Sequence, residues 1–514
     1  MGLFDQHMLE KRQYLLDRGI DPYPYRYDVT HQVARIRADE AALSGQDVSV
    51  AGRVLSIRQQ GRVAFLDLRD ATGAIQLMVA GERTDGDTQA LVPSLSPGDL
   101  VGCIGRIFRT RRGELTLAAR HLEMLAKVLI PLPLGKTASG KEFSRLNDLE
   151  TRHRHRHLEW IVRPESRETL HRRARILAAI RRVMDGLGFL EVTTPTIELT
   201  YGGAEARPFV TSVHALGNET AYLRISPELH LKRLVVGGFE KVYTICQNFR
   251  NEGIDRSHNP EFTMMEWYEV GTDYVDQMRR FEELVATVAE EVCGTTRIQY
   301  QGVPLDLTPP WRRLPMGEAV SEATGCAVDT ASAETLRALL GACGVPLSDP
   351  FTWGQAVATL FDAACAHMLS QPVFVMDHPI EVSPLAKRKR GNRRLAERFE
   401  PYIAGMEIGN AYSELTDPVE QYDRFLDQQR TAGSGSLPEH PLDLDFVRAL
   451  ACGMPPTGGV GLGIDRLIML LCDAPSIRDV IAFPLRARAA DQEGIRQVDQ
   501  LLRPGSGVWA RDPR

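Results

Sequence analysis

The sequence predicts an α+β protein in which a small β-barrel precedes a larger domain, and that larger domain combines an antiparallel β-sheet with flanking helices. Three observations support this prediction. Five short runs of β-forming residues lie between glycine-containing turns near the N-terminus, two strand pairs follow, and amphipathic helical patterns surround them. Hydrophobic residues make up 43% and charged residues 25% of the 514 residues, as is usual for globular proteins, and the length predicts about three domains.

The predicted barrel occupies residues 1–130 together with one N-terminal helix. The helix is expected from about Asp5 to Arg18, since Gly19 follows as a stop signal. The five strand candidates are 48–57, 63–68, 75–79, 100–108 and 115–122. Five short strands within about 75 residues are typical of the OB-type barrel, which binds single-stranded nucleic acid on one face with stacked aromatic rings.

Side chains of this barrel are candidates for contacts with RNA bases. Phe65 begins a strand where its ring can stack on an unpaired base, and Gln76 carries both a donor and an acceptor. Arg58 lies toward the end of the first strand and can assist them. The alternative for Phe65 is a place in the barrel core, which is the commoner position of a phenylalanine in a strand.

After a proline-containing linker at 131–150, residues 151–488 are predicted to form one large domain. Its first long helix is expected at 164–187. Residues 300–370 have a mostly helical pattern and are interpreted as an insertion. Residues 489–514 are interpreted as a C-terminal extension that the domain does not require.

The most informative stretch is 248–269, interpreted as two strands joined by a polar loop. Period-two alternation places Phe262, Glu266 and Tyr268 on one face, so that an aromatic ring, a carboxylate and a phenol share a surface. Arg250 ends the first strand. An arginine facing carboxylates and an aromatic ring is unusual for a surface hairpin, so this stretch is a candidate binding site.

A second strand pair is predicted within 398–414. Alternation places Asn410 and Glu414 on one face, but it places Glu407 on the other face. If Glu407 shares a site with these residues, the strand must contain a bulge at Gly409 or its neighbours, because one extra residue returns a side chain to the same face.

Glycine-rich stretches offer space for a ligand close to the backbone. The run 458–463 precedes a helical pattern, and Arg466 falls in the first turn of that helix. Gly203 belongs to a second stretch, which either admits a ligand or forms a tight turn. Glu228, at the start of another helix, either binds an ammonium group or is a first-turn residue favoured by the helix dipole.

The candidate site combines cations with an unusual number of carboxylates. Arg250 and Arg466 suit phosphate, whereas the carboxylates suit Mg²⁺ or an amine. These carboxylates are Glu228, Glu266, Glu400, Glu407 and Glu414. Buried together, they would repel one another without counter-charge, and ATP with Mg²⁺ and a dibasic amino acid would supply it. The basic stretch 387–394 is equally compatible with contacts to ATP phosphates or to tRNA.

These motifs resemble those of class II aminoacyl-tRNA synthetases and, in detail, those of the lysyl-tRNA synthetases. Three motifs carry the resemblance in the order that the family has. They are the helix, Gly188, strand and Pro195 junction; the stretch from Arg250 through Glu252 and His258 to Glu266; and the sequence GLGIDR from Gly461 to Arg466. The resemblance covers nearly the whole chain up to residue 486.

The resemblance implies an anticodon-binding barrel followed by a class II catalytic domain, an antiparallel sheet flanked by helices. It also implies a ligase that activates L-lysine with ATP to lysyl-adenylate and transfers lysine to the 3′-terminal ribose of tRNA(Lys), with Mg²⁺ as cofactor. A homodimer is expected. No apolar run approaches the roughly 18 residues of a membrane helix, and the N-terminus lacks the pattern of a signal peptide, so we expect a cytoplasmic protein without membrane contact.

The resemblance further implies a role for each candidate residue. The catalytic residues would be Arg250 and Arg466. ATP would be bound by Arg250, Glu252, His258, Phe262 and Arg466. Lysine would be bound by Gly203, Glu228, Arg250, Glu266, Tyr268, Asn410 and Glu414. Mg²⁺ would be bound by Glu400 and Glu407, and the anticodon by Arg58, Phe65 and Gln76.

Related enzymes and rival functions define the alternatives. The aspartyl and asparaginyl enzymes share the barrel and the motifs, but Glu266 and Glu414 would repel an acidic substrate. Glu205 departs from the family pattern, which has a small or neutral residue there. One rival is a relative that lysylates a protein acceptor, but such relatives lack the barrel. Another is a catalytically silent paralogue that binds lysine or RNA, against which the intact metal carboxylates and arginines argue.

Overall fold

The computed structural model describes residues 4–81, 84–134, 136–138, 141–143, 148–345, 351–431 and 442–485 of the chain. These residues form two compact units, one ending at Arg167 and the other running from Glu168 to Leu485. The predicted C-terminal extension at 489–514 and part of the predicted linker at 131–150 lie outside the described residues.

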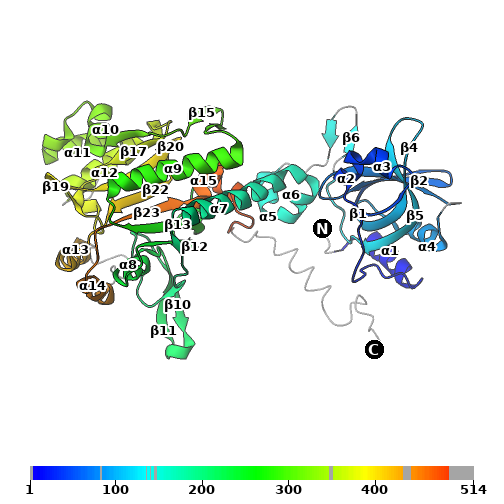
Figure 1. The fold of residues 1–514 in the computed structure, drawn as a ribbon, viewed down its shortest axis with the longest axis horizontal. Coiled ribbons are helices and arrows are strands. Elements are labelled where there is room, and N and C mark those ends of the chain that lie inside the picture. The colour runs from blue at the N-terminus through cyan, green and yellow to red at the C-terminus, as the bar shows by residue number, and fades with distance from the viewer. Residues whose placement is uncertain are drawn as a thin grey trace. The chain divides into compact units, whose positions relative to one another are not determined.

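The first unit contains the predicted five-stranded barrel (Figure 1). Its strands are β1 (Asp47–Gln60), β2 (Val63–Arg69), β3 (Ala74–Ala80), β4 (Leu100–Arg109) and β5 (Leu115–Ala126). They close in the order β1-β2-β3-β5-β4. Because side chains alternate along a strand, Leu66, Leu68 and Leu77 are fully buried inside the barrel while their sequence neighbours face outward. The strand predictions are confirmed.

Helices and a small hairpin complete the first unit. The helices are α1 (Gln6–Leu16), α2 (Val33–Ala38), α3 (Glu40–Leu43), α4 (Gly86–Leu91), α5 (Leu149–Arg154) and α6 (Arg156–Val162). The hairpin consists of β6 (Lys136–Ala138) and β7 (Lys141–Phe143). The predicted N-terminal helix is confirmed: the side chain of Asp5 accepts a hydrogen bond from the backbone of Met8 and so caps α1.

A nine-stranded sheet is the centre of the second unit. Its strands are β8 (Leu190–Glu191), β12 (Lys241–Phe249), β13 (Glu261–Val270), β16 (Arg312–Pro315), β17 (Val373–Met376), β20 (Arg398–Ile403), β21 (Met406–Glu407), β22 (Gly409–Ser413) and β23 (Thr457–Gly463). The order is β16-β17-β20-β22-β23-β13-β12-β8, with β21 paired to β20. The sheet is antiparallel, as predicted, except for the outer pairs β12-β8 and β16-β17. Long crossovers join these outer strands, and such connections permit parallel pairing.

Three helices cover one face of this sheet: α7 (Glu168–Gly186), α9 (Tyr274–Cys293) and α15 (Ile464–Leu471). Figure 1 shows α9 and α7 lying along the sheet. Ile180, Phe281 and Leu467 from the helices are buried in one core with Trp267 and Val460 from the strands. Because this face is apolar and closed, the polar side chains of the same strands face the opposite side of the sheet, where a site can form.

Residues 297–376 add a group of smaller elements, and those from Leu314 onward share a separate apolar core. The helices are α10 (Met316–Thr324), α11 (Ala333–Ala342) and α12 (Trp353–Ala364), and a hairpin is formed by β14 (Arg297–Tyr300) and β15 (Val303–Asp306). The stretch that the sequence suggests is mostly helical therefore contains short strands as well.

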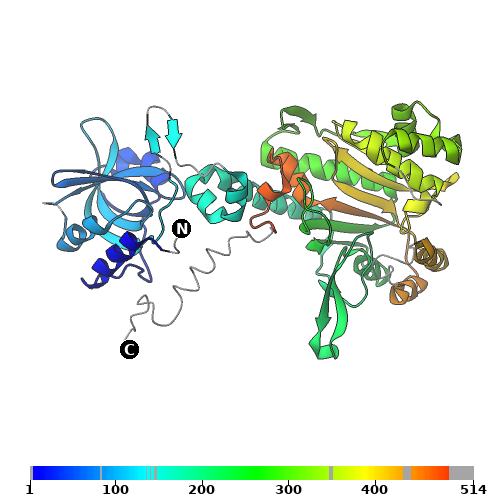
Figure 2. The same cartoon turned by 180° about the vertical axis from the view of Figure 1, so that it is seen from behind.

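The remaining elements lie around this sheet. Strands β9 (Ile197–Glu198), β10 (Phe209–Val213) and β11 (Glu219–Leu223) form a separate sheet, and the β10-β11 hairpin projects from the body of the unit (Figure 2). The others are α8 (Glu228–Val236), β18 (Arg388–Lys389), β19 (Asn392–Ala396), α13 (Pro418–Thr431), α14 (Leu444–Ala451) and α16 (Ile477–Val480). Within the described ranges, no helix combines the length and apolarity needed to span a bilayer.

The bulge predicted near Gly409 is confirmed by the strand register. Tyr402 of β20 pairs with Glu407, whereas Phe399 pairs with Ala411, so three steps along β20 match four steps along the opposite strand. The extra residue lies at the junction of β21 and β22, where Ile408 is buried in the core. The bulge returns Glu407 to the face that carries Asn410.

Candidate active site

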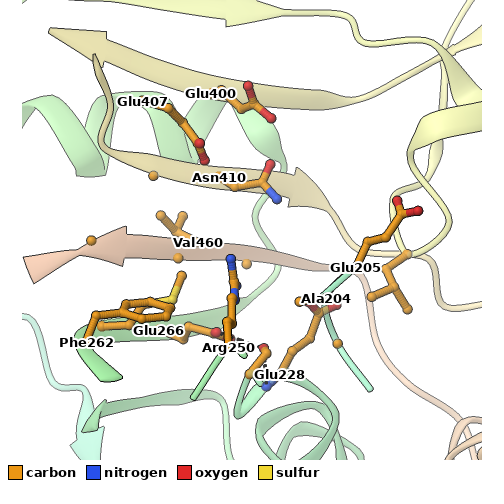
Figure 3. Close-up of a pocket in the computed structure, with 18 of the residues that line it drawn as sticks. Ala204, Glu205, Glu228, Arg250, Phe262, Glu266, Glu400, Glu407, Asn410 and Val460 are labelled. Atoms are coloured by element: carbon orange, nitrogen blue, oxygen red, sulfur yellow. Dashed lines mark hydrogen bonds between the residues drawn. The ribbon is translucent and has the colours of Figure 1, made fainter. Parts of the chain in front are cut away.

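A cavity of about 420 Å³ lies on the face of the sheet opposite α9. This volume falls within the usual range of ligand sites. Every candidate residue for catalysis, ATP, lysine and Mg²⁺ lines it except Glu414, which is buried just behind the wall. Figure 3 shows Arg250 pointing into the centre, with Glu400 and Glu407 on one side and Glu228 and Glu266 on the other.

Arg250 is a half-buried cation at the centre of the cavity. It follows β12, and its guanidinium lies 5.2 Å from the centroid of the Phe262 ring, a distance suited to a cation–π contact. Its Nε is buried and has no hydrogen-bond partner among the described residues. Burial lowers the pKa of Arg250, whereas Glu407 and Glu252 raise it. An anion entering the cavity would therefore find a donor that is already oriented and dehydrated.

Arg466 lines the cavity and is held by several contacts. Its guanidinium donates to the backbone carbonyl of Glu407 at 2.5 Å and is 2.9 Å from Nε2 of His258. Asp255, 2.7 Å from Nδ1 of His258, fixes the ring from the other side. Glu252, on the same loop, accepts a hydrogen bond from the backbone of Arg207 at 3.3 Å. These contacts connect the loop after β12 to the helix α15.

Asp465 anchors the helix that carries Arg466. Its carboxylate accepts a hydrogen bond from the backbone of Thr263 at 2.7 Å, which connects α15 to the strand of Phe262. Arg173 of α7 donates to its other oxygen at 2.5 Å. These contacts fix α15, and with it Arg466, to the strand that carries Phe262.

Glu400 and Glu407 form an oxygen-rich corner. Arg398 donates to Glu400 at 2.6 Å and to Asn410 at 3.0 Å, and Tyr402 donates to the second oxygen of Glu400 at 3.1 Å. Burial and the neighbouring Glu400 raise the pKa of Glu407. Two neighbouring carboxylates beside an anion site fit Mg²⁺, which usually combines one or two carboxylates with substrate phosphates.

The opposite end of the cavity carries the buried carboxylates of Glu228 and Glu266. The carboxylate of Glu266 is fully buried, and it accepts hydrogen bonds from Ser226 at 2.9 Å and Tyr268 at 3.3 Å. Burial and the nearby Glu228 raise the pKa of Glu266 to about 8, while Ser226, Arg250 and Tyr268 oppose this rise. An ammonium group would supply the missing charge.

Gly203 closes this end of the cavity. Its φ of +84° is rarely adopted by other residues, and a Cβ would lie 2.9 Å from Oγ of Ser226 and 3.1 Å from Cβ of Glu228. The backbone conformation and the lack of space for a Cβ both require glycine at this position. Asn410 donates to the hydroxyl of Tyr412 at 3.1 Å, and Tyr412 donates to Glu228 at 3.4 Å, so that a chain of hydrogen bonds joins β22 to α8.

Glu414 lies behind the wall, against Gly459, which itself lines the cavity. Oε1 of Glu414 is buried without a hydrogen-bond partner among the described residues. A Cβ on Gly459 would lie only 2.0 Å from this oxygen, so the absent side chain leaves the space that Glu414 occupies. Oε2 of Glu414 contacts Nζ of Lys232 at 2.5 Å.

The basic stretch 387–394 does not line the cavity. Arg388 pairs with Glu420 at 2.7 Å, and Lys389 pairs with Asp377 at 2.5 Å. Arg390 pairs with both Asp273 and Glu397. These ion pairs account for the position of the stretch, and contact with ATP is not needed to explain it. Glu205, by contrast, does line the cavity, and its side chain is exposed at the rim.

The candidate anticodon residues share the outer face of the barrel. Arg58 of β1 pairs directly with Phe65 of β2, and Asp67 pairs with Gln76 of β3, so alternation points all four side chains outward. Phe65 is half-buried and is not part of the barrel core. Arg58 forms a salt bridge with Asp67 at 3.0 Å. The structure therefore brings the three predicted residues together and adds Asp67.

Sequence reasoning missed several residues that hold this site together. Lys232 stands four residues after Glu228 on a predicted helix, a spacing that places both on one face and could have identified the pair. Arg398 alternates with Glu400 on a predicted strand. Ser226 offered no such signal, because its contact with Glu266 joins segments 40 residues apart.

Comparison with known proteins agrees with this architecture. Residues 148–487 match the family of class II tRNA synthetases (D, K and N), and residues 48–125 match the OB-fold nucleic acid binding domain. The chain therefore belongs to the class II tRNA synthetases of this group. The two matches together run from the barrel through α16.

Individual relatives extend this likeness over most of the chain. A protein of Synechococcus sp. (strain CC9311) named lysine–tRNA ligase is 50% identical over 487 residues, covering 93% of this chain and 97% of the relative. Lysine–tRNA ligases of Moorella thermoacetica and Roseiflexus castenholzii are 46% and 45% identical, and the chain covers 96% and 98% of them.

Proposed function

We propose that the protein is a lysine–tRNA ligase, which activates L-lysine with ATP and transfers it to the 3′-terminal ribose of tRNA(Lys). In the first step a carboxylate oxygen of lysine attacks the α-phosphorus of ATP. The bond between that phosphorus and the bridging oxygen breaks, and pyrophosphate leaves. In the second step a ribose hydroxyl of the tRNA attacks the carbonyl carbon of lysyl-adenylate, and AMP leaves.

Lysine is assigned to the acidic end of the cavity. Glu228 and the backbone at Gly203 bind the α-ammonium, while Glu266, Tyr268, Asn410 and Glu414 surround the side-chain ammonium. Charge balance supports this assignment, because the buried carboxylates exceed the cations near them and Glu266 has a raised pKa when the site is empty. Arg250 lies between the two ends and binds the substrate carboxylate.

ATP is assigned to the basic end. Phe262 and Arg466 hold the two faces of adenine, Glu252 and His258 position the nucleotide, and Arg250 binds the α-phosphate. The protein needs no nucleophile of its own, because the two reactants supply both reacting atoms and the site holds them in line. Arg250 and Arg466 are therefore the catalytic residues, stabilising negative charge as it develops.

Mg²⁺ is assigned to Glu400 and Glu407, whose carboxylates fit the ion as described above. When bound, Mg²⁺ neutralises phosphate charge and favours departure of pyrophosphate. Arg398 holds Glu400 in position, and the bulge beside Gly409 brings Glu407 to the same face.

The barrel is assigned to the anticodon of tRNA(Lys), which Arg58, Phe65 and Gln76 would contact on the outer face. We also propose a cytoplasmic homodimer that acts without a membrane. Exposed apolar side chains near the edge strand β8 support dimer formation: Leu190, Ile197 and Leu199 are 49%, 55% and 48% exposed. We retain 1–130 as the barrel domain, 131–150 as the linker, 151–488 as the catalytic domain and 489–514 as an extension.

The observation that carries this function is one cavity in which two half-buried arginines, Arg250 and Arg466, lie close to buried carboxylates such as Glu228 and Glu266. The test is lysine-dependent exchange of labelled pyrophosphate into ATP by the purified protein, without tRNA. Exchange with lysine and not with aspartate or asparagine is expected. Absence of exchange from folded protein would establish the alternative of a silent lysine- or RNA-binding paralogue, and exchange without charging of tRNA(Lys) would favour a protein acceptor.

A further inference from the structure

Lys232 is a fully buried cation beneath the acidic end of the cavity, and none of the roles above uses it. It stands on α8, one turn after Glu228. Its Nζ lies 2.6 Å from Oε1 of Glu228 and 2.5 Å from Oε2 of Glu414. One ammonium group therefore bridges the two carboxylates that are assigned to opposite ends of the bound amino acid.

This ammonium is fully enclosed by the protein. The rings of Tyr412 and Phe446 lie 6.0 and 5.9 Å from Nζ, and no part of the side chain is exposed. Burial lowers the pKa of Lys232, but Glu228 and Glu414 outweigh burial and raise it, so the group stays charged. Neither carboxylate can turn away without leaving a buried charge unpaired, which is strongly unfavourable.

Each carboxylate keeps one oxygen on Lys232 and offers the other toward the ligand side. The second oxygen of Glu228 accepts a hydrogen bond from Tyr412, whose ring lines the cavity. The second oxygen of Glu414 faces the position where Gly459 lacks a side chain. Lys232 thus sets where the two outward oxygens stand relative to each other.

We propose that Lys232 is a positioning residue that fixes the spacing of Glu228 and Glu414, and that this spacing selects an amino acid with two ammonium groups separated by the length of lysine. The inference rests on the proposed function, because it assigns the α-ammonium to Glu228 and the side-chain ammonium to Glu414. A side chain shorter by one methylene, as in ornithine, reaches only one of the two carboxylates.

The decisive variant is Lys232→Met, which keeps an unbranched side chain of similar length and removes the charge. The ratio of kcat/KM for lysine to that for ornithine, measured by pyrophosphate exchange, is expected to fall at least about tenfold. The KM for lysine should rise more than kcat falls, and the KM for ATP should stay unchanged. An unchanged lysine-to-ornithine ratio would overturn the proposal, even if total activity falls.

Lys127→Met is the matched control. Lys127 is also fully buried and pairs with the fully buried Asp99 at 2.8 Å, but it lies in the barrel unit. Removing it imposes a similar cost of an unpaired buried charge. This control is expected to lose stability without changing the lysine-to-ornithine ratio, which separates positioning from a general loss of folding.

A pH profile provides a readout that a purely structural role would not move. The groups facing Lys232 and Glu414 are Glu228 on α8, Glu266 and Tyr268 on β13, and Tyr412 on β22. Without the ammonium, Glu414 loses the cation that lowers its pKa. The fall in lysine KM with rising pH should therefore move to higher pH in Lys232→Met and stay in place in Lys127→Met.

Two further measurements decide the matter if Lys232→Met does not fold. Lys232→Gln keeps hydrogen-bond donors without charge and should shift the ratio in the same direction. In the unmodified enzyme, fixed spacing predicts that ornithine and homolysine, one methylene shorter and longer, are both disfavoured at least about tenfold. Acceptance of both would overturn the proposal. Loss of lysine-dependent exchange in the unmodified enzyme would refute the proposed function instead.

Discussion

The carboxylate of Glu266 is fully enclosed by the fold and stands near another carboxylate, Glu228. Ser226 and Tyr268 donate to it, but they bring no positive charge. The raised pKa of Glu266 is the physical consequence, because burial and a like charge both disfavour ionisation. A cationic ligand removes this penalty, so the residue is better suited to binding than to stabilising the empty protein.

Glu266→Gln is expected to weaken lysine binding far more than ATP binding. The amide keeps the shape but loses a charged hydrogen bond, whose typical value of about 1.5–3 kcal/mol corresponds to about a ten- to hundredfold rise in the KM for lysine. The KM for ATP should change less than about threefold. Steady-state pyrophosphate exchange measures both constants.

Glu261→Gln is the control for this variant, since Glu261 is an exposed carboxylate on the same strand β13. It should leave both constants unchanged. Equal losses of lysine and ATP binding in Glu266→Gln would show that this face of β13 has been assigned to the wrong substrate.

The pKa of Glu266 also predicts how lysine binding depends on pH. Below about pH 8 the carboxyl group of the empty site is partly protonated, and lysine must displace that proton. Affinity for lysine should therefore rise with pH between 6 and 8, by up to about tenfold per unit, with release of protons on binding. Calorimetry in buffers of different ionisation enthalpy measures that release.

Fewer protons should be released on lysine binding in Glu266→Gln, because the amide does not titrate. The proton release that remains is assigned to Glu414, because burial also raises the pKa of that residue. Lysine affinity that is independent of pH in the unmodified protein would contradict the assignment of these carboxylates.

Strand β23 contributes to the site through its glycines, which have no side chains. Its glycines stand between strands β13 and β22, and the side chains of those neighbours fill the space above them. A Cβ on Gly461 would lie 2.5 Å from Cε of Met264, and one on Gly459 would meet both Glu414 and Tyr268. The strand therefore leaves space on this face of the sheet for the side chains of its neighbours and for a ligand.

Gly459→Ala is expected to raise the KM for lysine at least about tenfold, because the new methyl group would push against Oε1 of Glu414, 2.0 Å away, and Cε1 of Tyr268, 2.5 Å away. The thermal midpoint should fall as well. Steady-state kinetics and thermal unfolding together measure the effect.

Gly341→Ala in α11 is the matched control, since a Cβ there would meet nothing within 4 Å. Alanine favours a helix, so this variant should gain about 0.5–1 kcal/mol of stability and keep its lysine KM. A Gly459→Ala enzyme with unchanged lysine KM would refute the role given to β23.

At the scale of the molecule, the two units carry separate parts of the proposed function. The cavity is lined entirely by residues of the second unit, whereas the candidate anticodon face lies on the barrel of the first. Activation of lysine needs only the cavity, and recognition of tRNA needs the barrel as well. Substitutions in the barrel should therefore separate the two reactions.

Phe65→Ala is expected to reduce charging of tRNA(Lys) by about five- to a hundredfold, since stacking of one base contributes about 1–3 kcal/mol. Lysine-dependent pyrophosphate exchange should remain unchanged. Charging of a tRNA transcript and exchange, measured on the same preparation, provide the comparison.

Phe65→Tyr keeps the aromatic ring and is the control, with near-normal charging expected. If Phe65→Ala charges tRNA as well as the unmodified enzyme does, the outer face of β1 to β3 does not bind the anticodon through this ring.

The local sequence pattern was sufficient to predict much of the fold and many residues of the site. Alternation along 262–268 assigned Phe262, Glu266 and Tyr268 to one face, and the register of β13 agrees. The bulge beside Gly409 was predictable because Glu407 and Asn410 could not otherwise share a face. Such conclusions depend on the fixed two-residue period of a strand, which is a local property.

The sequence by itself determined the order of the motifs, the alternation of the strands and the kinds of charge that the site must contain, since these depend on neighbouring residues. Only the tertiary structure decided that Phe65 lies outside the barrel core, that Glu414 is buried behind Gly459, and that Lys232 bridges Glu228 and Glu414. Such facts depend on which distant segments pack together. Burial then decides whether a charge is solvated or must find a partner.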